Sequence, residues 1–308
     1  ALYSSYQKGT EPSLPPLPIH YQDFVAWQSR RLASEALAED RNYWLNQLSG
    51  KLPALELVTD YSRPKVRTFN GEVVQFTIDK SLTGVLYLFS RDYDATLFMT
   101  LLSGLYALFY RYTGQSDIIL GTPISGRTHK DLEGQIGLYL NLLPLGVAVH
   151  GEDSFAELLD QVRDVTLSGY EHQAYPFASL IKELNFERDP ARPPLISAGL
   201  TLQNLNPLTS ATGDELGFKV SQFSQEIKTS EYDLWFLFSE RFGELTANVN
   251  YNTDIFQRET IELIWSRLVS VFVQVTDEPA RKIMDLEMSD GGAVIPEQIH
   301  ELAIELNV

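Results

Sequence analysis

Hydrophobic and polar positions divide the chain into alternating helical and extended segments. Apolar side chains recur at helical spacing over residues 21–48, 80–92, 95–112, 154–170, 177–185 and 256–275. Ser154 and Glu157 form a capping-box pattern at the start of one of these helices, and Gly50 marks the expected end of another. Shorter apolar or alternating runs predict strands over 73–78, 117–120, 140–149, 195–203, 231–239 and 244–251. Helices interspersed with strands predict an α/β fold in which helices pack on a mixed β-sheet.

Several segments depart from this periodicity. Residues 10–19 contain four prolines, which exclude a regular helix or central strand, so we expect a connector; a Pro-rich ligand for a partner domain is the alternative. Residues 52–70 form a second irregular run, and the tail after Asp290 is typical of a Gly-Gly linker and a short acidic amphipathic helix. The uncharged run 95–110 is shorter than the roughly 18 apolar residues of a membrane span, so it predicts a buried helix.

Composition narrows the classes of function. The 308 residues fit one large domain or two ordinary ones, and 44% hydrophobic with 21% charged residues is globular usage. A net charge of −17 disfavours nucleic acid as a partner because phosphates would be repelled. The absence of cysteine excludes disulfides, thiolate metal sites and a cysteine nucleophile, and fits a reducing compartment, so a cytoplasmic protein is expected.

Most short motifs do not carry chemistry. Residues 121–128 have the spacing of a phosphate-binding loop, G-x-x-x-x-G-K-S/T, but Arg127 replaces the lysine and Pro123 removes a backbone N–H, so no nucleotide site is predicted. The five histidines never stand three or four residues apart, so no metal site is predicted. Residues 171–177 place His172 and Gln173 at a helix end before Pro176, either aimed into a cleft or with His172 bound to the helix C-terminus.

Six segments follow one another along the chain: YQDFVAW (21–27), RYTGQSD (111–117), GTPISGR (121–127), IGLYLN (136–141), HQAYPF (172–177) and RDPARPPL (188–195). Their order, within a match from Leu2 to about Asp290, resembles that of the condensation domains of nonribosomal peptide synthetases. The chain departs from the family pattern at Val25, Leu142, Ala174 and Ala178.

This resemblance implies two chloramphenicol-acetyltransferase-like lobes with a tunnel between them. In the intact parent, an amide bond would form between acyl or aminoacyl thioesters on the phosphopantetheine arms of upstream and downstream peptidyl carrier proteins. No cofactor or metal would be bound directly. The other expected partners are the neighbouring domains of a multidomain synthetase. The resemblance implies that this synthetase serves the biosynthesis of a secondary metabolite.

The family's His-His-x-x-x-Asp-Gly motif is absent from the sequence, because no two histidines are adjacent. The resemblance therefore implies a fragment that is inactive alone. Residues 1–50 would be the connector and helices from the end of the N-terminal lobe, 51–290 the C-terminal lobe, and 291–308 a linker toward a following domain.

The resemblance also implies roles for particular residues, none of them catalytic within this chain. The residues expected to line the tunnel or contact substrate are Asn141, His172, Gln173, Pro176 and Phe177. Those expected to be structural at the interface with the missing N-terminal lobe are Tyr21, Asp23, Trp27, Gly121, Thr122, Pro123, Gly126 and Arg127. Arg127 would pair with the aspartate of the missing motif. Three further candidate residues belong to the downstream motif at 188–195: Arg188, Asp189 and Arg192.

The departures at Leu142, Ala174 and Ala178 leave a second function open. A non-catalytic condensation-like module could instead recruit a carrier protein or a tailoring enzyme, since fold alone does not decide function. An epimerase or heterocyclase relative is disfavoured by residues 136–141 and 172–173. Loss of the other lobe also predicts an exposed apolar face and self-association.

Overall fold

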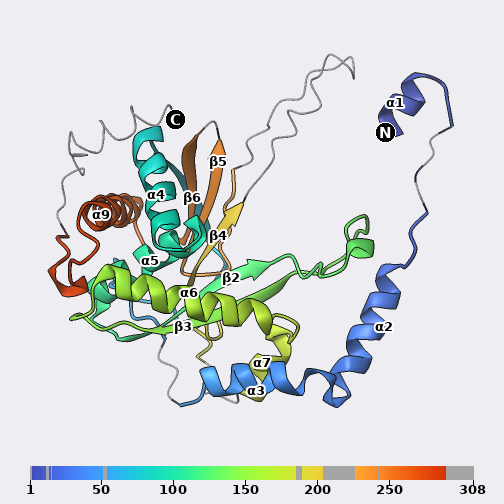
Figure 1. The fold of residues 1–308 in the computed structure, drawn as a ribbon, viewed down its shortest axis with the longest axis horizontal. Helices are drawn as coiled ribbons and strands as arrows, with labels where there is room; N and C mark the ends of the chain where they lie inside the picture. Colours follow the sequence, from blue (N-terminus) through green and yellow to red (C-terminus); the bar gives the residue numbers. More distant parts are fainter. Residues whose placement is uncertain are drawn as a thin grey trace.

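The architecture is a six-stranded mixed sheet with helices packed against it (Figure 1). The computed structural model describes residues 2–11, 14, 16–50, 54–184, 189–203, 226–241 and 243–288. The strands are β1 (Gly71–Ile78), β2 (Asp117–Ile124), β3 (Asn141–Ala148), β4 (Ala198–Gln203), β5 (Leu234–Arg241) and β6 (Glu244–Asn252). Their order across the sheet is β1-β6-β5-β4-β2-β3, in which β5, β4 and β2 run parallel and the other neighbours are antiparallel. The predicted mixed sheet is confirmed.

Apart from α1, the described helices lie at or close to the positions that hydrophobic spacing indicated. They are α1 (Leu2–Gln7), α2 (Tyr21–Leu32), α3 (Ala38–Gln47), α4 (Lys80–Asp92), α5 (Leu97–Thr113), α6 (Phe155–Glu171), α7 (Phe177–Glu183) and α9 (Arg258–Asp277). Short 3-10 turns lie at η1 (Glu35–Leu37), η2 (Lys130–Leu132) and η4 (Ile283–Asp285). The Ser154–Glu157 capping box is present at the start of α6.

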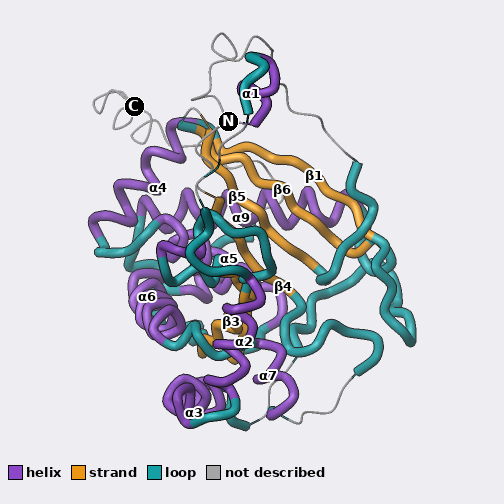
Figure 2. The backbone as a smooth tube through the Cα atoms, turned by 90° about the vertical axis from the view of Figure 1, so that its right-hand side faces the viewer, coloured by secondary structure: helices purple, strands orange, loops and turns teal. Residues whose placement is uncertain are grey.

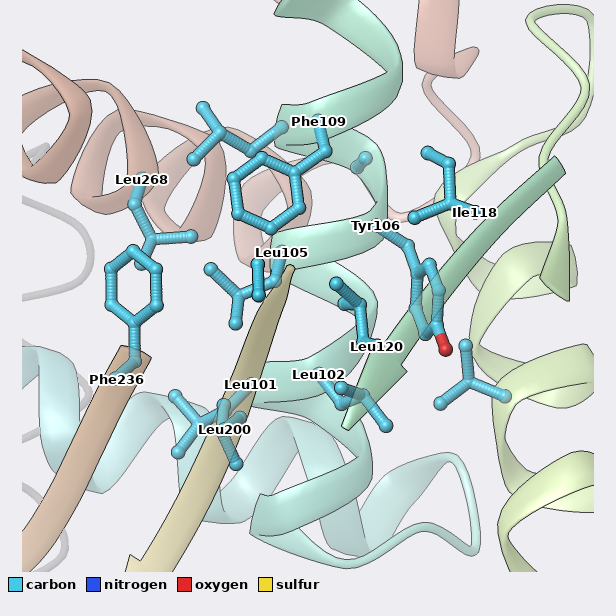
Figure 3. Packing of buried hydrophobic residues seen from close by; sticks show 14 of the residues in the cluster. Leu101, Leu102, Leu105, Tyr106, Phe109, Ile118, Leu120, Leu200, Phe236 and Leu268 are labelled. Carbon is cyan, nitrogen blue, oxygen red and sulfur yellow. The ribbon is translucent and has the colours of Figure 1, made fainter. Parts of the chain in front are cut away.

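Helix α5 is the centre of the core. It is buried from Met99 to Phe109, which confirms the predicted buried helix. Figure 3 shows its leucines and Phe109 packed between strands β4 and β5 on one side and Leu268 of α9 on another. Gly104 permits close contact between the helices, because a Cβ there would lie 2.3 Å from the ring of Phe272.

Two of the differences from the predicted boundaries concern segments near the predicted site residues. The helical run 21–48 is broken after Leu32, where Ser34 caps the 3-10 turn η1 and a separate helix, α3, begins. Strand β2 continues past Leu120 through Gly121 to Ile124, paired with β3. Residues 121–124 are therefore strand and not loop. The predicted tail helix lies outside the described residues.

Among the described residues, the helices that pack on the sheet leave its other face open (Figure 2). The inward residues of β6, including Leu245, Ala247 and Val249, belong to the core, whereas Thr246, Asn248 and Asn250 alternate to the other side. Figure 2 shows strands β1, β6 and β5 from this side, with α9 behind them.

Candidate functional site

The turn at residues 172–177 joins α6 to α7 and is held from the sheet by Asn141, the first residue of β3. The Asn141 Nδ2 donates to the carbonyls of Gln173 (3.0 Å) and Tyr175 (2.9 Å), and its Oδ1 accepts from the Phe177 N–H at 2.9 Å. That N–H belongs to the first residue of α7 and would otherwise lack a partner. Asn141 therefore fixes the backbone of this turn from its start to its end.

Helix α3 holds the same turn from the opposite direction. His172 Nδ1 lies 3.1 Å from Asp40 Oδ1, and its ring stacks on Tyr43 with centroids 4.2 Å apart. Trp44 donates its indole N–H to the His172 carbonyl at 2.8 Å. The His172 side chain is thus engaged by α3, and Gln173 bonds back to the Tyr170 carbonyl at 2.7 Å.

A second contact between α3 and α7 supports this arrangement. The Glu183 carboxylate receives a hydrogen bond from the Tyr175 hydroxyl and pairs with Arg41 at 2.5 Å. Burial, followed by the neighbouring Glu183 carboxylate, raises the pKa of Tyr175 to about 12. The hydroxyl therefore remains a neutral donor through the physiological range.

Arg127 lies in the segment 125–140, which extends beyond the β2–β3 hairpin (Figure 1). Its guanidinium carbon is 4.2 Å from the centroid of the Tyr139 ring, and it donates to the Leu132 carbonyl. Among the described residues, no carboxylate forms an ion pair with Arg127. Gly126 adopts a positive φ of 61°, and a Cβ there would collide with the Tyr139 carbonyl, so glycine is required.

Helix α2 packs on this segment. Phe24 is buried with Leu132 and Tyr139, and the Tyr21 hydroxyl donates to the Leu138 carbonyl at 3.1 Å. Asp23 accepts from the His20 N–H at 2.9 Å and so caps its own helix. Trp27 stays 44% exposed. Of the remaining predicted interface residues, Gly121, Thr122 and Pro123 lie within β2.

The downstream motif anchors a different segment. Arg192 pairs with Glu56 (2.7 Å) and Asp189 (3.3 Å), which attaches the irregular run after residue 53 to the loop before β4. Arg188 lies outside the described residues. The structure therefore brings the five predicted tunnel residues together at one turn: Asn141, His172, Gln173, Pro176 and Phe177. Arg127 and the downstream motif contact other parts of the chain.

Two contributions could not be predicted from the sequence. The α3 residues Asp40, Tyr43 and Trp44 carried only a helical spacing signal, and their partners at position 172 are far away in sequence. The irregular run also holds a buried bidentate pair, in which Arg63 contacts Asp233 at 2.9 and 2.7 Å. No local pattern pairs these residues.

Comparison with known proteins identifies the family. The family model described as the condensation domain matches residues 1–292, and the chain therefore belongs to the condensation-domain family. Its curated relatives are nonribosomal peptide synthetases. Bacitracin synthase 3 of Bacillus licheniformis is 36% identical over 279 residues, covering 90% of this chain and 4% of that protein. Tyrocidine synthase 3 of Brevibacillus parabrevis is 35% identical over 286 residues, covering 93% of this chain and 4% of that protein.

Solved structures confirm the chloramphenicol-acetyltransferase-like fold. The X-domain in its complex with OxyB from teicoplanin biosynthesis superposes with a TM-score of 0.83 at 23% identity, covering 92% of this chain and 64% of that one. The first condensation domain of the calcium-dependent antibiotic synthetase, in complex with a substrate analogue, gives 0.70 at 20% identity, covering 92% and 61%. This chain therefore spans about two thirds of those structures and 4% of each of the two curated relatives.

Two further features concern the part of the chain that the structure describes. None of its helices is long and apolar enough to cross a membrane. In the same part of the chain, no group of three or more histidine, aspartate and glutamate residues is placed so that it could hold a metal ion.

Proposed function

We propose that this chain is the C-terminal lobe of an amide-forming condensation domain that works together with a preceding lobe. The observation that carries the proposal is the family match over residues 1–292, combined with a span of about two thirds of the solved condensation-type structures. Residues 1–50 would then form the connector and helices from the end of the first lobe, 51–290 the second lobe, and 291–308 a linker to the next domain.

The reaction joins two thioesters held on phosphopantetheine arms of carrier proteins. The amine of one thioester attacks the carbonyl of the other, a C–N bond forms, the C–S bond breaks, and the released thiol takes up a proton. The base or positioning imidazole for the amine would come from the preceding lobe, because this sequence holds no His-His pair. This chain would supply a wall of the tunnel.

The turn at 172–177 is our candidate for that wall. Gln173, Pro176 and Phe177 are uncharged, as is the pantetheine arm. Asn141 fixes the backbone of the turn with three hydrogen bonds. Rigid placement of this kind lowers the cost of holding the reacting atoms together. His172 would contribute through its contacts with Asp40 and Tyr43, which keep the turn attached to α3.

Arg127 would complete the contact between the lobes by pairing with the aspartate of the missing motif. Its side chain is half-buried and placed by Tyr139 and Leu132, yet it has no carboxylate partner among the described residues. In the joined domain, Arg127→Met should lower amide formation by about tenfold to a hundredfold, because a small displacement of the catalytic loop is costly. The distant surface change Arg258→Met is the matched control. Equal rates for the two variants would refute this role.

The direct test of the function is dipeptidyl transfer between two loaded carrier proteins, with this chain joined to its preceding lobe. Transfer by the joined domain supports amide formation. If the upstream lobe carries an intact His-His-x-x-x-Asp-Gly motif and no transfer occurs, the amide-forming function is wrong.

A non-catalytic docking module is the second candidate. The observation that favours it is the loss of the family's ionisable residues at Ala174, within the turn, and at Ala178, in the first turn of α7. This function predicts retention of a carrier protein or tailoring enzyme on the joined domain without any transfer. A degraded His motif in the upstream sequence would favour it.

A further inference from the structure

Gln135 is a buried polar side chain within a largely exposed segment. It is 4% exposed, whereas the neighbouring Ile136 is 97% exposed. The Gln135 Nε2 donates to the Ile19 carbonyl at 2.7 Å and to the Asp131 carbonyl at 3.1 Å. Its Oε1 accepts a hydrogen bond from the Tyr139 hydroxyl. An amide is costly to bury unless it is paired, and these three bonds pair it at both ends.

One of these bonds joins two distant parts of the chain. Ile19 precedes Gln135 by 116 positions and lies just before α2. The Tyr139 ring packs against Phe24 of α2, with centroids 4.6 Å apart. Gln135 therefore binds the connector directly at Ile19, and through the Tyr139 hydroxyl it also holds the ring on which α2 packs.

The contacts of Arg127 lead back to the same residue. Its guanidinium carbon lies 4.2 Å from the Tyr139 ring centroid, and the guanidinium donates to the Leu132 carbonyl. Gln135 contacts both of these groups, because its Oε1 accepts from the Tyr139 hydroxyl and its backbone N–H donates to the Leu132 carbonyl at 3.3 Å. A cation over a ring is placed by the face of that ring. A change at Gln135 would therefore reach Arg127 through two contacts.

We propose that Gln135 is a positioning residue, which holds Tyr139 and Leu132 and through them orients the Arg127 guanidinium for its contact with the preceding lobe. The inference rests on the proposed function, because that function gives Arg127 its aspartate partner. A free arginine side chain has many rotamers, so fixing it before the partner arrives lowers the cost of forming the contact. Gln135 itself would touch neither the substrate nor the reacting atoms.

The placement of Arg127 can be measured on the full chain without any catalysis. Its Nε–H signal in magnetic resonance is assigned by its loss in Arg127→Met, and the Tyr139 ring current displaces that signal from the position of exposed arginines. Gln135→Met is similar in size and shape but removes the amide, so it should move the Arg127 signal toward that position. An unmoved signal in a folded Gln135→Met chain would overturn the proposal.

Gln115 offers a matched control. It lies before β2, at the opposite end of that strand from Arg127, and its amide also bonds irregular backbone. The Gln115 Nε2 donates to the Ala54 carbonyl at 3.0 Å, and its Oε1 accepts from the Glu56 N–H at 2.7 Å. Gln115→Met should therefore lower the Tm without moving the Arg127 signal. Equal movement of that signal in both variants would overturn the proposal.

A double variant separates positioning from stability. Gln135→Met leaves the buried Tyr139 hydroxyl without its acceptor, so the Tm should fall. Adding Tyr139→Phe removes that hydroxyl and should recover most of the Tm, while the Arg127 signal stays displaced. The double variant also replaces Gln135→Met if the single variant does not fold. Return of the Arg127 signal together with the Tm would show that Gln135 acts through stability alone, which would overturn the proposal.

Activity in the joined domain tests whether Gln135 acts through Arg127. Gln135→Met should lower the kcat of amide formation by about fivefold to tenfold, with the KM for the loaded carrier proteins unchanged. In the Arg127→Met background the same change should have an effect of less than about twofold, because the contact that it prepares is already lost. Equal losses in the two backgrounds would overturn the proposal.

The positioning role and the proposed function can fail separately. If the unchanged joined domain transfers nothing while Gln135→Met still moves the Arg127 signal, the amide-forming function fails and the placement of Arg127 by Gln135 stands. If Arg127→Met lowers transfer while Gln135→Met changes neither transfer nor the Arg127 signal, the function stands and the role of Gln135 is wrong.

Discussion

At the scale of single residues, side chains that satisfy backbone or charged groups hold the irregular parts of the chain. Asn141 does so at the α6–α7 turn, where one amide bonds three backbone groups. Arg63 does so in the irregular run before β1, where it neutralises Asp233. Both arrangements predict a measurable decrease in the free energy of unfolding when Asn141 or Arg63 is replaced.

Asn141→Asp should destabilise the fold by about 2 kcal/mol, because a carboxylate oxygen would face two carbonyl oxygens that now accept hydrogen bonds. Urea unfolding gives the free energy. The matched control is Asn248→Asp on the open sheet face, where no described residue bonds the amide. Similar losses for both variants would contradict the assigned role of Asn141.

Arg63→Met should cost about 3 kcal/mol, because Asp233 would be left charged and unpaired in the interior. The Asp233 side chain is only 3% exposed. The double variant Arg63→Met with Asp233→Leu should recover most of that loss, since a buried pair can be replaced by apolar groups at little cost. No recovery in the double variant would show that the arginine acts through other contacts.

At the scale of elements, helix ends decide how the layers connect. Helix α6 begins at the Ser154–Glu157 capping box and ends at the turn that α3 and β3 hold. Pro176 precedes α7 and separates the two helices. The cap at the start of α6 adds a dependence of stability on pH.

Hydrogen bonds from the Ser154 backbone and then its hydroxyl lower the pKa of Glu157 from its ordinary 4.5. A lowered folded-state pKa contributes stability above the unfolded pKa, and that stability is lost as pH falls through the folded value. Thermal melting of Glu157→Gln should therefore show a lower Tm than the unchanged chain at neutral pH, with the difference shrinking well below pH 4.5. The exposed Glu133→Gln is the control. A difference independent of pH would contradict the account.

The spacing of apolar residues and the capping motifs were sufficient to predict elements whose boundaries depend on residues nearby in sequence. The bounds predicted for α4 are those observed, and the capping box located the start of α6. The extension of β2 depends on its pairing with β3, which spacing does not encode. The break after Leu32 coincides with Ser34, whose side chain caps the 3-10 turn η1. In the candidate site, the polar residues His172 and Gln173 at a helix end before Pro176 indicated the turn at 172–177. Its partners on α3 could not be found, because Asp40 and Trp44 lie 132 and 128 residues from His172 in sequence.

At the scale of the whole molecule, the chain presents an apolar surface away from its core. Ile136 is 97% exposed and Leu138 72%, within the segment that α2 supports. Such a surface usually marks a contact with protein. The proposed preceding lobe is the natural occupant.

The chain alone should therefore self-associate as its concentration rises. Sedimentation velocity at increasing concentration should show a growing dimer or larger fraction, and the double variant Ile136→Asp with Leu138→Asp should shift the chain toward monomer. Val58→Asp, an exposed change on another segment, is the control. A monomer at all concentrations would contradict this expectation.

The most direct measurement of the central claim compares dipeptidyl transfer by this chain alone with transfer by the chain joined to its preceding lobe. Both reactions would use the same pair of loaded carrier proteins. An amide product is expected only with the joined domain, since the sequence of this chain holds no His-His pair. Product from the chain alone, or none from a joined domain that carries an intact His-His-x-x-x-Asp-Gly motif, would contradict it.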